Sequence, residues 1–225
     1  MTAARVTLAL DAATYEGSVA VIRGGVVVAE RTVAMRGETE ERLMPAVLAA
    51  LADAGCTVRD VERVVCGEGP GSFTSLRIAG AIAKGIAMGN DVPLYGVSSL
   101  ALIVAAHAQH TPTLADGRYL ALLDAMRDER YAALYAVANG VVVEIERIGR
   151  VAVADLATLC EKKEARAIGP REMIDAAPHA RGVAMMLDAI LATGAVMLDT
   201  WEPEYGRLAE AQVKWEAAHG RALPA

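Results

Sequence analysis

The sequence is poor in aromatic side chains, which make up 4% of it as six tyrosines, two tryptophans and one phenylalanine. It is also short of basic charge, because 22 lysines and arginines stand against 28 aspartates and glutamates and leave a formal net charge of −6. A free-standing nucleic-acid-binding protein normally carries a basic face with aromatic side chains among the basic ones. The composition therefore disfavours a protein that binds nucleic acid on its own.

Cysteine and histidine are scarce as well. The three cysteines, at positions 56, 66 and 160, are odd in number and too far apart for a CxxC pair, which favours reduced, buried thiols in a cytosolic protein. Of the four histidines only His107 and His110 are close in sequence, and that spacing near a helix end is more typical of a favourable C-terminus than of a ligand pair. We therefore expect no metal site.

Long hydrophobic runs are missing, since none reaches the roughly 18 residues of a membrane span. The chain still has 225 residues and 54% hydrophobic content, enough to bury a substantial core. These features predict a soluble cytoplasmic protein with no membrane partner.

The first half of the chain alternates strand and helix patterns. Apolar runs predict strands at 6–11, 18–22 and 26–33, with Gly24-Gly25 as a hairpin turn between the last two. Further patterns predict a helix at 39–54, a strand at 61–66, a helix at 73–88, a strand at 94–97 and a helix at 98–107. That order predicts a ribonuclease-H-like lobe.

The second half repeats this theme after a polar connection at 109–117. Three strands are predicted at 119–123, 130–137 and 141–148, with Asn139-Gly140 as a hairpin turn. We therefore expect an α/β protein with two ribonuclease-H-like lobes, at 1–110 and 111–225, the second reduced. That layout is typical of the actin, Hsp70 and sugar-kinase superfamily. A charged final helix at 209–218, anchored by Trp215, is expected to dock on the first lobe or on a partner.

The most informative motif is the run GEGPGSFTSLRI at 67–78, which joins a strand, a tight turn and a helix start. Gly69 and Gly71 allow backbone conformations that side chains forbid, and Ser72 or Thr74 can cap the first free N–H groups of the helix. Such a turn can hold a phosphate or a partner's backbone, although it also occurs as a plain connection.

The helix at 73–88 is apolar over more than half its circumference. Its branched stripe of Ile78, Ile82 and Ile86 suits a sheet, while a neighbouring stripe of small residues suits close approach by another helix. Together with the helix at 39–54 this predicts a partner interface, or, as the alternative, two wholly internal stripes. The predicted interface residues are Leu43, Val47, Leu51, Leu76, Ala79, Gly80, Ala83 and Ala87. On that view Ala83→Arg would abolish assembly and leave the fold intact.

The wording of the glycine motif resembles the GPGSFTG-L-R-I-G signature of the TsaB family, the non-catalytic partner subunit in bacterial synthesis of threonylcarbamoyladenosine in tRNA. The resemblance continues in order along the chain. Its other segments are Leu8-Ala9-Leu10-Asp11-Ala12-Ala13-Thr14, Arg42-Leu43-Met44-Pro45, Tyr95-Gly96-Val97-Ser98-Ser99-Leu100, Leu123-Asp124-Ala125-Met126-Arg127-Asp128-Glu129-Arg130-Tyr131 and Pro203-Glu204-Tyr205-Gly206-Arg207.

This resemblance implies a scaffold subunit with no catalytic residues and no tightly bound cofactor of its own, leaving room for ATP or ADP at a subunit interface. It implies a TsaD-like catalytic partner, a TsaE-like ATPase, a homodimer when alone, and tRNA contacted only through the complex. Two departures bear on the pairing. The acidic residues 38–41 replace a His-Ser pair common in relatives, and Ser75 replaces a glycine.

The superfamily likeness also implies a cleft between the lobes. The candidate nucleotide or cleft residues are Asp11, Thr14, Gly69, Gly71, Ser72, Thr74, Arg77 and Asp124. Ala12 and Ala13 stand where full members carry glycines, so Asp11 reads equally well as a strand-end residue that binds nearby amides. Two other functions stay open: a self-sufficient ATP-binding phosphotransferase and a homodimeric binding module.

Overall fold

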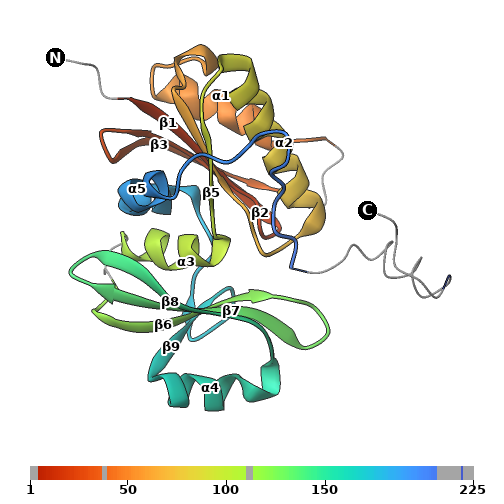
Figure 1. The fold of residues 1–225 in the computed structure, drawn as a ribbon, viewed down its shortest axis with the longest axis vertical. Helices are drawn as coiled ribbons and strands as arrows, with labels where there is room; N and C mark the ends of the chain where they lie inside the picture. Colours follow the sequence, from red (N-terminus) through yellow and green to blue (C-terminus); the bar gives the residue numbers. More distant parts are fainter. Residues whose placement is uncertain (1–4, 37–39, 110–113, 207–218, 220–225) are drawn as a thin grey trace.

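The computed structural model describes residues 5–36, 40–109, 114–206 and 219, which form two α/β lobes (Figure 1). The first lobe contains a five-stranded sheet in the order β3-β2-β1-β4-β5, and the second a sheet in the order β10-β9-β6-β7-β8. In each sheet the first three strands along the chain pair antiparallel, each with the next. The fourth strand then pairs in parallel with the first. The predicted fold class, two ribonuclease-H-like lobes, is confirmed.

Eight of the ten strands in the described residues lie close to predicted positions, and β9 and β10 were not predicted. The strands of the first sheet are β1 (Val6–Asp11), β2 (Glu16–Arg23), β3 (Val26–Ala34), β4 (Arg63–Gly67) and β5 (Leu94–Val97). Those of the second are β6 (Gly117–Asp124), β7 (Glu129–Ala138), β8 (Val141–Ala152), β9 (Ala165–Gly169) and β10 (Ile174–Asp175). Both residues of each predicted hairpin turn, Gly24-Gly25 and Asn139-Gly140, have positive φ, as a tight turn between twisted strands requires.

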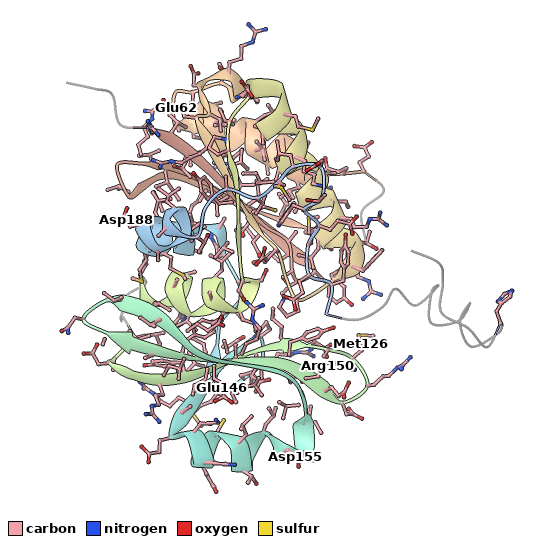
Figure 2. The ribbon with its side chains drawn as sticks, viewed as in Figure 1. Glu62, Met126, Glu146, Arg150, Asp155 and Asp188 are labelled. Carbon is pink, nitrogen blue, oxygen red and sulfur yellow. The ribbon has the colours of Figure 1, made fainter. Side chains whose placement is uncertain are left out.

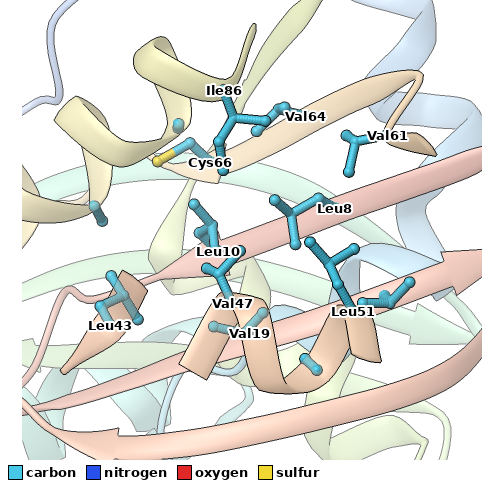
Figure 3. Packing of buried hydrophobic residues seen from close by; sticks show 14 of the residues in the cluster. Leu8, Leu10, Val19, Leu43, Val47, Leu51, Val61, Val64, Cys66 and Ile86 are labelled. Carbon is cyan, nitrogen blue, oxygen red and sulfur yellow. The ribbon is translucent and has the colours of Figure 1, made fainter. Parts of the chain in front are cut away.

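Two helices cover one face of the first sheet, α1 (Leu43–Asp53) and α2 (Phe73–Asn90). The sheet's central strand, β1, is buried along its whole length, so its side chains alternate between two cores. Leu8 and Leu10 point towards α1 and α2, where they meet Val47 and Leu51 (Figure 3), and Ala9 points to the opposite face. Burial of each such leucine contributes about 1.5–3 kcal/mol.

Helix α1 begins later than predicted. The expected range was 39–54, and α1 starts at Leu43. Residue 39 lies outside the described part of the chain. The Glu41 carboxylate accepts hydrogen bonds from the N–H groups of Leu43 and Met44, so it satisfies donors that a preceding helical turn would otherwise occupy. Pro45 lies in the first turn, where its missing N–H costs nothing.

Helix α3 (Ser99–Ala108) lies between the two sheets (Figure 1). Leu102 packs against the face of the first sheet to which Ala9 points. Leu100 and Ile103 pack into the core of the second lobe. Helix α4 (Leu156–Lys163), which the sequence pattern did not reveal, covers the far face of the second sheet through Leu156.

Within the range 111–225 that was predicted as the second lobe, the chain returns to the first lobe. Helix α5 (Val183–Ala192) returns to the first lobe, where Val183, Leu187 and Ile190 cover the face of the sheet that α1 and α2 leave bare. The following segment stays there, because the Val196 N–H donates to the Leu94 carbonyl at 2.8 Å and Trp201 packs into the first core. The reason is physical: the second face of the first sheet is apolar and needs a cover. The predicted final helix at 209–218 and Trp215 lie outside the described residues.

Within the described ranges no helix is long and apolar enough to cross a membrane.

Candidate functional site: the cleft between the lobes

A cavity of about 590 Å³ opens between the two lobes. The first lobe lines it with the turn after β1 and the start of α2, and the second with the ends of β6 and β7 and the loop after β9. Segment 203–206 closes one side with Tyr205. The cavity is therefore built from four loops that the fold brings to the same edge of both sheets.

Asp11, at the end of β1, lies behind this cavity and does not line it. Its side chain is fully buried, with Oδ2 accepting from the Ser99 hydroxyl at 2.5 Å and Oδ1 accepting from the Ala13 N–H at 3.1 Å. Burial raises the pKa of the carboxyl, and these hydrogen bonds oppose the rise. Ser99 Oγ also accepts from the Gly69 N–H at 3.1 Å, so Asp11 holds the glycine turn in place.

The two turns of the first lobe touch directly. The Ser72 N–H donates to the Ala13 carbonyl at 2.8 Å, and a Cβ on Gly71 would overlap that same carbonyl. Only glycine fits at position 71 for this reason.

Ser72 is the N-cap residue of α2, as predicted, but its side chain does not cap the helix. Its hydroxyl instead lies 3.0 Å from that of Ser75. The first N–H groups of α2 therefore stay without a side-chain cap at the edge of the cavity, where their partial positive charge favours an anion.

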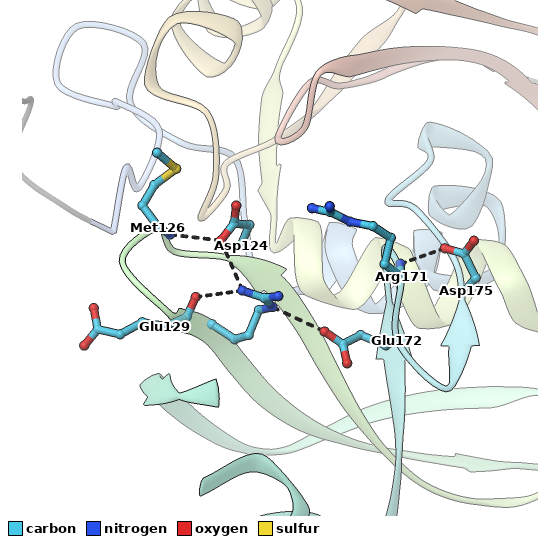
Figure 4. Close-up of polar contacts among 7 residues, drawn as sticks. Asp124, Met126, Glu129, Arg171, Glu172 and Asp175 are labelled. Carbon is cyan, nitrogen blue, oxygen red and sulfur yellow. Dashed lines mark hydrogen bonds and ion pairs between the residues drawn. The ribbon is translucent and has the colours of Figure 1, made fainter. Parts of the chain in front are cut away.

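The second lobe contributes an ion-pair cluster beneath the cavity (Figure 4). Arg130 binds Asp124 at 3.2 Å and Glu172 at 3.3 Å, and Asp124 Oδ1 also accepts from the Met126 N–H at 3.0 Å. Arg130 is only 23% exposed, so this cluster joins β6, β7 and the loop after β9 into one rigid wall.

Four segments of the second lobe hold non-glycine residues with positive φ. Two of them, at Asn139 and Glu164, do not line the cavity, and the other two reach it. Met126, Arg127 and Asp128 all have φ between 53° and 63°, and Arg171 has φ 65°. Each such non-glycine residue costs on the order of 1–3 kcal/mol. Met126 and Arg171 line the cavity from two different loops, and Met126 stands at the edge of its lobe (Figure 2).

The cavity brings together half of the predicted cleft residues, namely Thr14, Gly71, Ser72 and Asp124. Gly69 lies beneath the chain at Glu204, whose carbonyl a Cβ on Gly69 would overlap. Thr74 and Arg77 are exposed on α2, and the Arg77 guanidinium stacks over the Phe73 ring at 5.2 Å. Thr14 is engaged locally, because its hydroxyl donates to the Glu16 carbonyl at 3.0 Å.

Sequence reasoning missed the aromatic and arginine residues of the cavity, which are Tyr15, Phe73, Arg130, Tyr131, Arg171 and Tyr205. Tyr131 and Tyr205 stood in motifs that carried the family resemblance, so a signal was present. Phe73 and Tyr205 pack with ring centroids 4.4 Å apart, although 131 residues separate them in sequence.

The eight residues predicted as a partner interface are all buried inside this chain, as the alternative of internal stripes expects for them. They are Leu43, Val47, Leu51, Leu76, Ala79, Gly80, Ala83 and Ala87. The small stripe of α2 faces the sheet and segment 201–203, and Ile78 and Ile82 of the branched stripe are only half-buried. Small side chains let α2 approach these neighbours closely: a Cβ on Gly80 would lie 3.1 Å from Pro203 Cγ. Ala83→Arg would therefore disrupt the core instead of leaving the fold intact.

The outward faces of α1 and α2 are nonetheless apolar. Leu48 is 50% exposed and Met88 is 67% exposed. The other exposed apolar or small positions on these two helices are Pro45, Ala49, Ala52, Ala81, Gly85 and Gly89. We call this set, with Leu48 and Met88, the outer α1/α2 face.

Metal-ligating side chains are not gathered anywhere in the described ranges: no group of three or more histidine, cysteine, aspartate or glutamate residues is placed to hold an ion. Cys56 and Cys66 are buried, as predicted, and Cys160 is half-buried; all three are free thiols.

Two sheets of the same topology, joined by a buried helix and opening on one cleft, define a two-lobed protein of the actin-like ATPase fold. Residues 23–171 match the family model described as TsaD, tRNA N6-adenosine threonylcarbamoyltransferase. A Bacillus subtilis protein named tRNA threonylcarbamoyladenosine biosynthesis protein TsaB is 29% identical over 226 residues, spanning 92% of this chain and 96% of that protein. The Escherichia coli protein of the same name is 38% identical over 129 residues, or 57% of this chain and 54% of that one.

A solved structure of YeaZ from Pseudomonas aeruginosa superposes with a TM-score of 0.71 and 26% identity, covering 89% of this chain and 99% of that one. The chain therefore belongs to the family that the TsaD model describes and, within it, to the TsaB (YeaZ) family.

Proposed function

We propose that this chain is a non-catalytic subunit of the assembly that makes threonylcarbamoyladenosine in tRNA. Its relatives' names support the pathway, and one observation supports the non-catalytic role. Asp11, one of the candidate cleft residues, is fully buried with both oxygens bonded inside the chain. Through the Ser99 hydroxyl this carboxylate holds the glycine turn in place, and it cannot reach a substrate.

The proposed partner is a TsaD-like catalytic subunit, joined by a TsaE-like ATPase. The outer α1/α2 face supports such a contact, because it presents apolar and small side chains that let a partner's helices approach closely. The transfer of threonylcarbamoyl to the adenosine beside the anticodon, in tRNAs that read A-starting codons, would occur on the partner. The tRNA would be held through the complex, as the net charge of −6 suggests.

In this proposal the chain has no tightly bound cofactor of its own, and ATP or ADP belongs at the joint interface of the subunits. The rival function, a self-sufficient phosphotransferase, would use the carboxylate at the end of β1, and Asp11 does not line the cleft.

The test is reconstitution of tRNA modification with cognate TsaD-like, TsaE-like and adenylate-forming proteins, with and without this chain. We expect modification only when the chain is present, and none from the chain alone. Modification that proceeds equally without it would refute the proposed role.

A pair of variants tests the surface. Gly85→Arg places a charge on the outer α1/α2 face, where a Cβ meets no atom within 4 Å, so the fold tolerates it. Ala189→Arg places the same charge on an exposed position of α5. Calorimetric titration with the TsaD-like subunit should show at least tenfold weaker binding for Gly85→Arg and unchanged binding for Ala189→Arg. Equal affinity for both variants would exclude this face.

The same face also serves the homodimer that we expect when the chain is alone. Light scattering should then show a dimer that the TsaD-like subunit converts into a mixed complex. A homodimer that persists with excess partner would favour a self-associating binding module instead.

A further inference from the structure

We propose that the outer part of the cleft binds a small organic anion, meaning a compact apolar or aromatic group that carries a single carboxylate or phosphate monoester. This site is separate from the outer α1/α2 face and does not depend on the proposed role in tRNA modification. The walls of the cavity, one arginine and two strained loops support this site.

The walls suit an apolar group. Phe73 and Tyr205 form one wall with their rings 4.4 Å apart, and the Tyr131 hydroxyl is 3.4 Å from the Tyr205 carbonyl. Leu123 and Met126 come from the opposite lobe. A volume of about 590 Å³ lies inside the range of ordinary ligand pockets. The rings are already fixed by one another, so a ligand does not have to order them.

One cation in this cavity is unused. Among the charged residues of the lining, Asp124 and Arg130 are paired with one another, and Glu16 and Arg171 are both exposed. The Arg171 guanidinium forms no ion pair with any residue in the described ranges, and Arg171 lines the cavity together with Asp124; both side chains are drawn in Figure 4. The uncapped start of α2 adds partial positive charge from the facing lobe. An anionic group between them would be held from both sides.

The strained loops point to the same place. The backbone at Met126 is held in its left-handed conformation by the Asp124 carboxylate, and that at Arg171 by the Asp175 carboxylate, which accepts from the Arg171 N–H at 2.9 Å. Two separate loops thus carry backbone strain that is stabilised by an acidic side chain, and both direct a long side chain over one cavity. Strain of this kind concentrates at binding sites.

The geometry also limits the anion. In the first lobe the Ser72 N–H is bonded to the Ala13 carbonyl, so this N–H is not free to bind a chain of phosphates. A single anionic group at Arg171, with its apolar body against Phe73 and Tyr205, needs only the open part of the cleft.

The test uses two fluorescent probes that share an aromatic body. One, 8-anilinonaphthalene-1-sulfonate, carries one anionic group, and the other, N-phenyl-1-naphthylamine, carries none. We expect the anionic probe to saturate at one site of the full chain. Arg171→Gln should weaken that probe about tenfold, the contribution of one charge-assisted hydrogen bond, and leave the neutral probe unchanged. Tyr205→Ala should weaken both probes.

Arg127→Gln is the matched control, because Arg127 is an exposed arginine of the strained loop that does not line the cavity. It should leave both probes unchanged. If Arg171→Gln and Arg127→Gln lower affinity for the anionic probe equally, general charge attraction explains the binding and the site is refuted.

Competition identifies the class of anion. Benzoate and phenyl phosphate carry the same ring, the first with a carboxylate and the second with a phosphate monoester. Displacement of the probe by either compound supports the proposal and shows which anionic group the site binds. Displacement by magnesium ATP alone, or by none of these compounds, would overturn it.

Discussion

Replacing Gly85 with alanine should stabilise the folded chain. Gly85 lies in the interior of the 18-residue helix α2, is exposed, and has open space around the position of a Cβ. A glycine inside a helix loses more backbone entropy on folding than alanine does. The added methyl group meets no neighbour, so nothing in the folded chain offsets the gain.

The expected gain is about 1 kcal/mol in the free energy of unfolding. For a chain of this length that gain raises the melting temperature by about 2–4 °C. With a denaturant slope of about 2–3 kcal/mol per molar urea, the urea midpoint should rise by about 0.4 M. Urea titration followed by circular dichroism measures the change directly.

Gly80→Ala is the internal comparison. It lies on the same helix, but its Cβ would be 3.1 Å from Pro203 Cγ and 3.6 Å from Trp201 Cζ3, so segment 201–203 would have to shift. We expect this variant to be less stable than the natural chain. If Gly85→Ala were destabilising in the monomer, or if both glycines responded alike, the described placement of α2 would be wrong. A Gly85→Ala chain that is more stable alone yet binds its partner more weakly would show that the glycine is kept for close helix contact.

Three further outcomes follow from burial. Burial raises the pKa of Asp11 above 3.8 in the folded chain, so the free energy of unfolding falls as pH rises from about 3.8 through the pKa of the folded state. Asp11→Asn has no carboxyl group to ionise and so does not show this fall. Urea titrations from pH 3.5 to 7 should therefore show the free energy of unfolding of the natural chain decreasing relative to that of the variant as pH increases. A constant difference across that range would contradict the raised pKa. Leu51→Ala should lower the free energy of unfolding by about 3 kcal/mol, since Leu51 is 1% exposed, and a loss below about 1 kcal/mol would place this side chain outside the core. Burial also raises the pKa of the Cys66 thiol, so mass spectrometry after thiol alkylation at pH 8 should find it unmodified until the chain unfolds; rapid labelling of the folded chain would contradict this.

The order of strands and helices could be predicted from the sequence wherever one periodicity dominates. β1 is a continuous apolar run and α2 has a clear helical pattern, so both were located within a few residues. Helix α4 has few apolar residues and buries only Leu156, and β10 has two residues, so neither gave a usable pattern.

The orientation of α2 could not be predicted in the same way. Two stripes were visible, but sequence periodicity does not say which one meets the sheet. Segment 201–203, more than 100 residues away, packs beside Gly80 and provides the cover that was assigned to a partner.

The cavity was predictable only in part, for a similar reason. The strand order implies that β1, β4 and β6 end at one edge of the two sheets. That edge carries Thr14, Gly71 and Asp124, which line the cavity. Arg171 follows the short strand β9, and Tyr205 belongs to the returning segment, so their place depends on long-range packing that no local pattern records.

The return of α5 to the first lobe has a consequence for synthesis of the chain. The ribosome completes β1, β2 and β4 long before it makes Val183, Leu187 and Ile190, which cover one face of that sheet. Until then Ala9, Ala20 and Val65 have no partner on that side from α5. The first lobe therefore cannot reach its final state during translation before the second lobe has been made.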